Sequence, residues 1–309
     1  MKNLVLGIDV GGTNIKFGVI DRAGAILARS HLKTQRYTRD SKKLIAAVFA
    51  AIEELLAEHS LSPRQFAGIG MGLPGAVNPQ RGEVLSLPNI PGWKNVPLRK
   101  IFEQRFKIPA ILENDVNMIT LGEWKFGAGI GYQNLVCVTL GTGVGGGLIF
   151  NGSLYRGEGF VAGEIGHMPL NEDGPACNCG GRGCFERYVG NQTLLATIAR
   201  IFHRDLTIED VYALAGRGDP KALRFWEETA VHIGNGLTGV VNLLNPPLII
   251  IGGGVSNNHR FLFPMIKKVI KTRAMKVQAR MVKIVRAQLD NDAAILGARV
   301  LVNSSVKNS

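Results

Sequence analysis

The sequence has no long apolar stretch and no recognisable export signal. No window of its 309 residues approaches the roughly 20 consecutive apolar residues of a membrane-spanning helix. The apolar run at the amino terminus is short and is broken by Asp9, Gly11 and Gly12, which is typical of a strand and a turn and not of a signal peptide. We therefore expect a cytoplasmic protein with no membrane partner.

Two common nucleotide-binding signatures are also missing. The chain contains no G-x-x-x-x-G-K-[ST] motif, which excludes a P-loop protein. Residues 141–146 match the dinucleotide fingerprint G-x-G-x-x-G, but that fingerprint needs a helix after it, and residues 147–152 read as a strand and a turn. We therefore do not interpret the match as a nicotinamide site.

Acidic residues are absent from residues 260–286, where nine Lys or Arg residues occur. This run supplies much of the net charge of +12, and such a basic surface can attract nucleic acid. No nucleic-acid-binding motif accompanies it. We expect no nucleic-acid partner, and we interpret the run as a solvated surface that also suits an anionic nucleotide.

Cysteine is scarce, but three of the four cysteines lie within eight residues of one another. Cys177, Cys179 and Cys184 form the pattern C-x-C-x₄-C, and His167 lies ten residues before the first of them. Three thiolates and one imidazole make a closed tetrahedral zinc site with no position left for water, so we predict a structural Zn²⁺. The alternative is three free cysteines. Cys137 lies in an apolar run and is expected in the core.

Strands and helices alternate along the chain, and the pattern restarts near residue 134. A shift of 130 residues sets Asp9-Val10-Gly11 on Thr139-Leu140-Gly141, with an apolar strand on each side of both turns. This weak internal repeat predicts a duplicated α/β protein, with a ligand cleft between two lobes. Chance similarity between two glycine-rich hairpins remains the alternative.

Three glycine-rich turns follow apolar strands, at residues 11–12, 141–147 and 252–254. Glycine allows the backbone to approach a phosphate closely and leaves its N–H groups free to donate. The hairpin from Asp9 to Lys16 is the most specific, because its acid, hydroxyl and ammonium suit Mg²⁺ and phosphates. A purely structural turn is the alternative. The predicted nucleotide-binding residues are Asp9, Gly11, Gly12, Thr13, Lys16, Thr142, Gly143, Gly253 and Gly254.

Asn114 and Asp115 stand at the end of a predicted strand at 109–113, before a predicted helix. Open α/β sheets place ligands at the carboxyl ends of strands, where an Asp can accept the proton of an attacking hydroxyl. The alternative is that Asp115 only caps the following helix. The residues alone leave both interpretations open.

These motifs together resemble the repressor/ORF/kinase (ROK) family of bacterial sugar kinases, which has the hexokinase and actin-like ATPase fold. The resemblance covers nearly the whole chain, through Asp9–Lys16, Gly72–Gly75, Asn89–Trp93, Glu113–Asp115, Thr139–Gly147, Glu164–His167, Cys177–Glu186 and Gly252–Gly254. It implies a duplicated fold with two lobes around a central cleft. Residues 1–116 would form the amino-terminal α/β lobe, to which a closing helix at 291–302 returns. Residues 117–290 would form the carboxy-terminal α/β lobe, with the zinc knuckle at 167–184.

The resemblance also implies an ATP-dependent hexose kinase that uses Mg²⁺ with ATP and has Asp115 as its general base. The implied sugar-binding residues are Gly75, Asn89, Asn114, Asp115, Glu164, His167 and Glu186. His167 would bind zinc through one ring nitrogen and face a sugar hydroxyl with the other. The zinc would thereby order the loop that carries the sugar ligands.

Several alternatives remain open. Glucose is the leading substrate, but residues 187–191 depart from the pattern typical of the family's glucokinases, so N-acetylmannosamine, N-acetylglucosamine and fructose stay as candidates. The basic run at 260–286 keeps polyphosphate open as a donor. Some members of the family are sugar-sensing repressors with an added amino-terminal helix-turn-helix. Because the phosphate hairpin begins by Leu4, we expect a kinase, and a homodimer or homotetramer.

Overall fold

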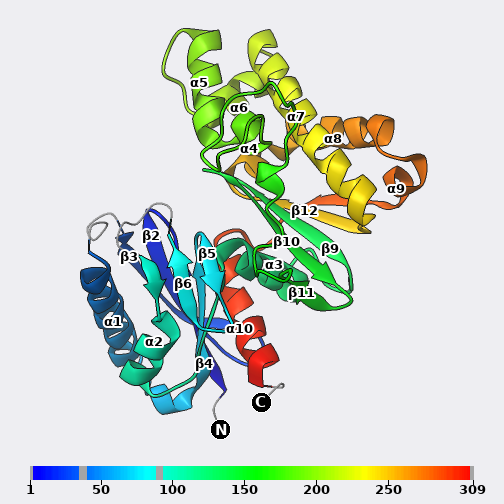
Figure 1. The fold of residues 1–309 in the computed structure, drawn as a ribbon. Helices are drawn as coiled ribbons and strands as arrows, with labels where there is room; N and C mark the ends of the chain where they lie inside the picture. Colours follow the sequence, from blue (N-terminus) through cyan, green and yellow to red (C-terminus); the bar gives the residue numbers. More distant parts are fainter. Residues whose placement is uncertain (1–2, 35–39, 88–92, 307–309) are drawn as a thin grey trace. The chain divides into compact units, whose positions relative to one another are not determined.

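The computed structural model describes residues 3–34, 40–87 and 93–306, and the chain divides into two compact units (Figure 1). The first unit comprises Met1–Ile130, Leu154–Ala162 and Gln288–Ser309, and the second comprises Gly131–Ser153 and Gly163–Ala287. The closing helix belongs to the first unit, as expected. The boundary expected at residue 116 falls inside the helix Asp115–Phe126, which packs against the closing helix and stays in the first unit as far as Ile130. No helix of the described ranges is long and apolar enough to cross a membrane.

The first unit contains a five-stranded mixed sheet with the order β3-β2-β1-β4-β8. β1 pairs antiparallel with β2 and parallel with β4, and β4 pairs parallel with β8. The strands are β1 (Leu4–Val10), β2 (Asn14–Ile20), β3 (Ile26–Lys33), β4 (Phe66–Leu73) and β8 (Ala110–Asn114). The carboxyl ends of β1, β4 and β8 therefore share one edge of the sheet.

One face of this sheet is covered by α1 (Ser41–Glu58) and α2 (Leu98–Phe106). Alternate residues of a strand point to opposite faces, and Leu6 and Ile8 of β1 join the apolar cluster with buried residues of both helices. The helix α1 begins where the Asp40 side chain accepts hydrogen bonds from the backbone N–H groups of Lys42 and Lys43. Its apolar residues recur every three or four positions, as the sequence predicts.

The opposite face of the sheet is covered by α10 (Ala293–Val306), which also packs against α3 (Asp115–Phe126). The strands present small residues to α10: a Cβ added to Gly7 or Gly70 would contact Ala298. Where α3 and α10 cross, a Cβ on Gly122 would overlap a carbonyl oxygen of α10, and one on Gly297 would overlap a carbonyl oxygen of α3. The two helices are therefore held at a separation that only glycine allows.

The sequence predicts turns over residues 76–95, but the described part of this stretch forms a small antiparallel sheet of β5 (Ala76–Asn78), β6 (Glu83–Ser86) and β7 (Lys94–Val96). Strands of three or four residues are too short to show a clear alternation of apolar and polar positions, which is why the sequence pattern did not reveal them.

The second unit repeats the sheet of the first, with the order β11-β10-β9-β12-β13. β1 ends at Val10 and β9 at Leu140, while β2 begins at Asn14 and β10 at Val144, so both turns keep the offset of 130 residues. The predicted duplication is confirmed. The strands are β9 (Leu135–Leu140), β10 (Val144–Phe150), β11 (Ser153–Tyr155), β12 (Leu248–Gly252) and β13 (Lys283–Arg286). The helices are α4 (Glu186–Val189), α5 (Asn191–Phe202), α6 (Ile208–Gly216), α7 (Pro220–Leu244), α8 (His259–Arg273) and α9 (Lys276–Met281).

Candidate functional site

The predicted phosphate hairpin is the turn between β1 and β2. The backbone N–H of Gly11 donates to the carbonyl of Asn14 at 2.9 Å, which closes the turn. The buried Thr34 fixes it from the side: its N–H donates to the carbonyl of Thr13, and its hydroxyl donates to the carbonyl of Gly11, both at 2.9 Å. Gly12 and Thr13 are exposed at the tip. An ordered turn with an exposed tip is what phosphate contact through the backbone requires.

Asp9 and Lys16 lie opposite one another in the two strands of this hairpin. Burial raises the pKa of the Asp9 carboxyl, and the positive charge of Lys16 partly offsets the rise. The Nζ atom of Lys16 donates to the Asn291 side chain at 2.9 Å. A divalent cation near Asp9 would favour its charged form, so its position suits a residue that holds Mg²⁺ through water.

The second group of predicted residues gathers where β4 and β8 end. Gly72 pairs with Glu113, and Leu73 pairs with Asn114. The Asn114 side-chain amide lies 3.4 Å from the carbonyl oxygen of Gly75, which has a positive φ of 89°. Gly75, Asn114 and Asp115 are therefore neighbours in the first unit. Asn89, which was also predicted to bind sugar, lies outside the described residues.

Asn114, and not Asp115, caps the helix α3. Its side-chain oxygen accepts from the backbone N–H of Val116 at 2.9 Å and of Asn117 at 3.2 Å. Asp115 is the first residue inside the helix, where the positive end of the helix dipole favours a carboxylate. The Oδ1 atom of Asp115 also accepts from the Val116 N–H at 2.9 Å, so Asn114 is the N-cap residue and Asp115 contributes a second hydrogen bond at the helix start.

The register of the sheet brings the hairpin and this turn to one edge. Asp9 pairs with Gly72, and Gly72 pairs with Glu113. Adjacent strands lie about 4.8 Å apart, so Asp9 and Glu113 are about 10 Å apart across the intervening strand. Asp115 follows Glu113 by two residues. The first unit thus places the phosphate hairpin and a candidate base on the same edge.

The second unit has an equivalent edge. The backbone N–H of Gly141 donates to the carbonyl of Gly143 at 2.9 Å, which closes the turn that contains Thr142. Gly252, at the end of β12, pairs with Thr139. Gly253 and Gly254 follow directly, so the four predicted nucleotide-binding residues of this unit lie at the ends of two adjacent strands.

Glu186 holds the 141–144 turn in place. Its Oε2 atom accepts a hydrogen bond from the backbone N–H of Val144 at 2.9 Å. The N–H of Asn191, at the start of α5, donates to the carbonyl of Gly141 at 2.9 Å. Sequence reasoning assigned Glu186 to the sugar and missed this contact, which joins residues 42 positions apart.

The predicted metal ligands are together. The ligand atoms of His167, Cys177, Cys179 and Cys184 all lie within 4.8 Å of one another. The Nδ1 atom of His167 is 3.7 Å from the Cys177 sulfur, and the Cys179 and Cys184 sulfurs are 3.6 Å apart. A tetrahedron with zinc–sulfur bonds of about 2.3 Å has edges of about 3.8 Å, so the donor set and its spacing fit a four-coordinate metal.

The neighbouring thiols also make ionisation of Cys184 unfavourable in the absence of a cation. Burial and the neighbouring Cys179 and Cys177 thiols raise the pKa of Cys184 to about 12. Three adjacent thiols do not ionise together without a cation to neutralise them. A metal ion would supply that charge and hold the sulfurs as thiolates.

The loop of the knuckle depends on a glycine. Gly183 has a φ of 63°, and a Cβ there would overlap the carbonyl oxygen of Asn171. Backbone pairing between Pro169 and Cys184, and between Ala176 and Arg182, folds the loop onto itself. This reversal brings the cysteines back toward His167.

His167 presents its second nitrogen to Glu164. The Nε2 atom lies 3.9 Å from a Glu164 carboxylate oxygen, while Nδ1 faces the cysteines. The Glu164 side chain is 61% exposed. Two predicted sugar ligands are therefore adjacent, and one of them belongs to the metal cluster.

Comparisons with known proteins identify the family to which the chain is similar. A model of the ROK family matches residues 5–305. The glucokinase of Halalkalibacterium halodurans is 37% identical over 96% of this chain and 94% of its own length. The structure of a ROK family glucokinase from Streptomyces griseus in complex with glucose and AMPPNP is 33% identical, with a TM-score of 0.81, over 97% of this chain and 99% of that one. A xylose repressor of Caldicellulosiruptor bescii is 29% identical over 98% of this chain and 78% of its own length.

Proposed function

The chain belongs to the ROK family, and on this premise we propose that it transfers the γ-phosphoryl group of ATP to a hydroxyl of a hexose, with glucose as the leading substrate. The observation that carries the proposal is the place of Asp115. Asn114 takes the capping role, and the sheet register sets the phosphate hairpin on the same edge as Asp115. The full-length similarity to glucokinases supports the choice of reaction and sugar.

In the proposed mechanism Asp115 accepts the proton of the attacking sugar hydroxyl as the new O–P bond forms, and ADP leaves with the electrons of the bond that breaks. The Mg²⁺ that accompanies ATP would neutralise charge on the phosphates. Backbone N–H groups of residues 11–13 and 142–143, together with Lys16, Gly253 and Gly254, would contact the nucleotide. The Asp9 carboxylate would hold water on the metal.

The sugar would be held by side chains that exchange hydrogen bonds with hydroxyls. We assign this role to Asn114 and Asp115 in the first unit and to Glu164, His167 and Glu186 in the second, with Gly75 and Asn89 as further contacts. Zinc, which we propose for the Cys/His cluster, would act indirectly. It would fix the loop from Glu164 to Glu186, and through Glu186 the turn at 141–144.

A sugar-sensing transcriptional regulator is the second candidate, because a xylose repressor matches 98% of this chain. A sensor needs to bind sugar but needs no base and no nucleotide. The carboxylate at the start of α3 and the two glycine turns favour the kinase.

The decisive experiment measures formation of the sugar phosphate from glucose, N-acetylmannosamine, N-acetylglucosamine and fructose, with ATP and with polyphosphate as separate donors. We expect turnover with ATP, and with glucose most rapidly. A purified protein that binds a sugar by calorimetry but phosphorylates none of the panel would be a sensor. Turnover with polyphosphate alone would correct the donor.

We further propose a cytoplasmic homodimer or homotetramer. Light scattering on the purified protein would decide its oligomeric state, and a monomer at working concentration would contradict this part of the proposal.

A further inference from the structure

Glu113 is a charged residue in a buried strand. It is the fourth residue of β8, follows Ala110, Ile111 and Leu112, and is 1% exposed. Burial of a carboxylate is unfavourable unless other groups donate hydrogen bonds to it or neutralise it. Neither the proposed mechanism nor the fold of the strand explains why a charge stands here.

The hydrogen-bond donors around the Glu113 carboxylate account for a charge at this buried position. Its Oε1 atom accepts from the backbone N–H of Asn114 at 3.0 Å and from the side-chain amide of Asn117 at 2.9 Å. Its Oε2 atom accepts from the Nε atom of Arg156 at 2.6 Å. One oxygen therefore holds the turn that carries Asn114 and Asp115, and the other holds an arginine 43 residues further along the chain.

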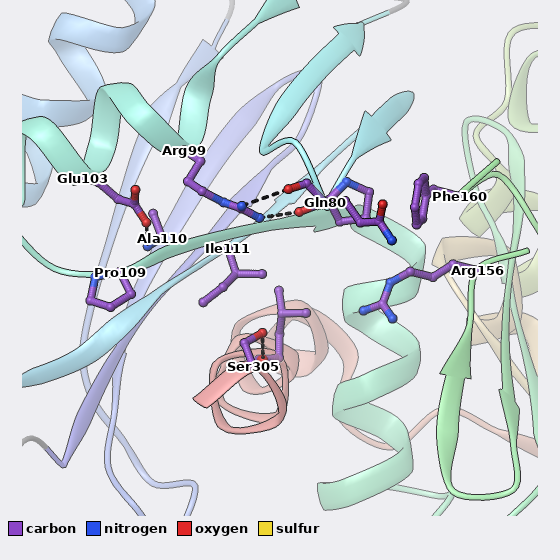
Figure 2. Close-up of a pocket in the computed structure, with 11 residues that line it drawn as sticks. Gln80, Arg99, Glu103, Pro109, Ala110, Ile111, Arg156, Phe160 and Ser305 are labelled. Atoms are coloured by element: carbon purple, nitrogen blue, oxygen red, sulfur yellow. Dashed lines mark hydrogen bonds between the residues drawn. The ribbon is translucent and has the colours of Figure 1, made fainter. Parts of the chain in front are cut away.

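Arg156 comes from the segment Leu154–Ala162, which returns to the first unit after β10. The segment is closed by a hydrogen bond from the N–H of Ala162 to the carbonyl of Arg156 at 2.9 Å. Figure 2 shows Arg156 and Phe160 on one side of a cavity of about 420 Å³, with Arg99 and Glu103 on the other.

We propose that Arg156 and Glu113 are a positioning pair for the phosphoryl-transfer step. The guanidinium fixes the Glu113 carboxylate, the carboxylate fixes the Asn114 backbone and the first turn of α3, and that turn aims Asp115 at the sugar hydroxyl. Neither residue touches the substrate. The inference rests on the proposed function, because it takes Asp115 as the base.

The test compares Arg156→Gln, Arg156→Lys, Glu113→Gln and the double variant Glu113→Gln/Arg156→Gln. Each is assayed at a temperature well below its own Tm, so that loss of folded protein does not enter the rate. We expect kcat to fall at least about tenfold in both Gln variants, because a small misplacement of a reacting group slows the chemical step strongly. Lys should restore part of the rate, and the double variant should be no slower than the slower single variant, because the two residues act as a unit.

Arg99→Gln is the matched control. Arg99 lines the same cavity, but it donates to the carbonyls of Pro79 and Gln80 and not to the turn that carries Asn114 and Asp115. We expect it to lower Tm while kcat stays within about twofold, which separates loss of a half-buried arginine that lines the cavity from loss of the positioning contact.

Three outcomes decide the inference. If the wild type phosphorylates glucose and the Arg156 and Glu113 variants keep its kcat while losing only Tm, the pair is structural and the inference is wrong. If kcat falls as expected while Arg99→Gln leaves it unchanged, the inference stands. If the wild type phosphorylates no sugar, the proposed function fails and the positioning role in phosphoryl transfer is overturned with it. The two failures are distinguishable, because in the first outcome the wild type remains an active kinase.

Discussion

Asn114 and Asp115 are adjacent at the start of α3 and have different roles in the proposed site. Asn114 satisfies the free N–H groups of the first helical turn, which a helix start requires. Asp115 is the first residue of the helix, at the position where the helix dipole favours negative charge, and its Oδ1 atom also accepts from the backbone N–H of Val116 at 2.9 Å. The order Asn-Asp, with the neutral residue first, is therefore part of the proposed site.

The role of Asp115 is tested by Asp115→Asn, which is nearly isosteric and keeps the capacity to hydrogen-bond. We expect kcat to fall by roughly 10²–10⁴-fold, because the general base is lost. Sugar affinity, measured by calorimetry, should change only a few-fold. Glu209→Gln is the control, because Glu209 is an exposed carboxylate in the first turn of α6. A variant rate within a few-fold of wild type would remove Asp115 from the base role.

Some residues of the candidate site could be predicted from the sequence and others could not. The side chains expected to be ligands could be named, because carboxylates, thiols and glycines at strand ends are typical of such sites. The residues that support these side chains could not be identified from the sequence. Thr34, which holds the hairpin, and Asn291, which accepts from Lys16, are ordinary polar residues far from their partners in sequence. Glu113 could have been noticed in the sequence, because it is a charged residue directly after three apolar strand residues.

At the scale of elements, the loop that carries His167, Cys177, Cys179 and Cys184 is expected to depend on the proposed zinc. We expect elemental analysis to find about one zinc per chain, and Cys179→Ser to lose it together with sugar affinity, since structural zinc sites contribute directly to folding. Cys137→Ala is the control, because this cysteine is buried in β9 away from the cluster. Full activity in a metal-free protein would contradict the assignment.

The carboxyl end of α3 offers a second test at this scale. The buried Glu123 accepts hydrogen bonds from the N–H groups of Ala128, Gln288 and Leu289 at 2.7–3.0 Å. Glu123→Ala leaves three amides without their acceptor, so we expect the free energy of unfolding to fall by about 2–4 kcal/mol. Glu227→Ala, on the exposed side of α7, should stay within about 0.5 kcal/mol. Denaturant titration measures both, and equal midpoints would refute the expectation.

Long elements were predictable and short ones were not. The helix α1 lies at 41–58, where the 3.6-residue spacing of apolar side chains predicts it. The strands β5, β6 and β7 have only three or four residues, and pairing with neighbours decides their structure more than their own composition does.

At the scale of the whole molecule, the proposed reaction uses groups from both units: Asn114 and Asp115 from the first, and Glu164, His167 and Glu186 from the second. Phosphoryl transfer also favours exclusion of water, which would otherwise accept the phosphoryl group. We therefore expect saturating sugar to reduce the radius of gyration in small-angle scattering. A sugar that the protein does not phosphorylate is the control, and identical profiles with and without substrate would count against closure.

The duplication could be read from the sequence because a glycine turn between two strands leaves the same pattern twice. The position of the boundary between the units could not be read from the sequence, since it depends on packing between α3 and α10, which are far apart in sequence. Local patterns predict local elements, whereas the boundary of a unit is set by contacts between distant ones.

The place of α10 in the chain has a consequence for synthesis on the ribosome. All residues of the second unit have been synthesised once Ala287 is added, whereas the first unit, although begun earlier, still lacks Gln288–Ser309. At about 5–20 residues per second, those last 22 residues take roughly one to four seconds more. During that time the glycine-lined face of the first sheet has no Ile295 or Ala298 against it. The unit whose synthesis begins first is therefore also the unit whose synthesis ends last, and its sheet cannot be covered by α10 until the end of the chain is free.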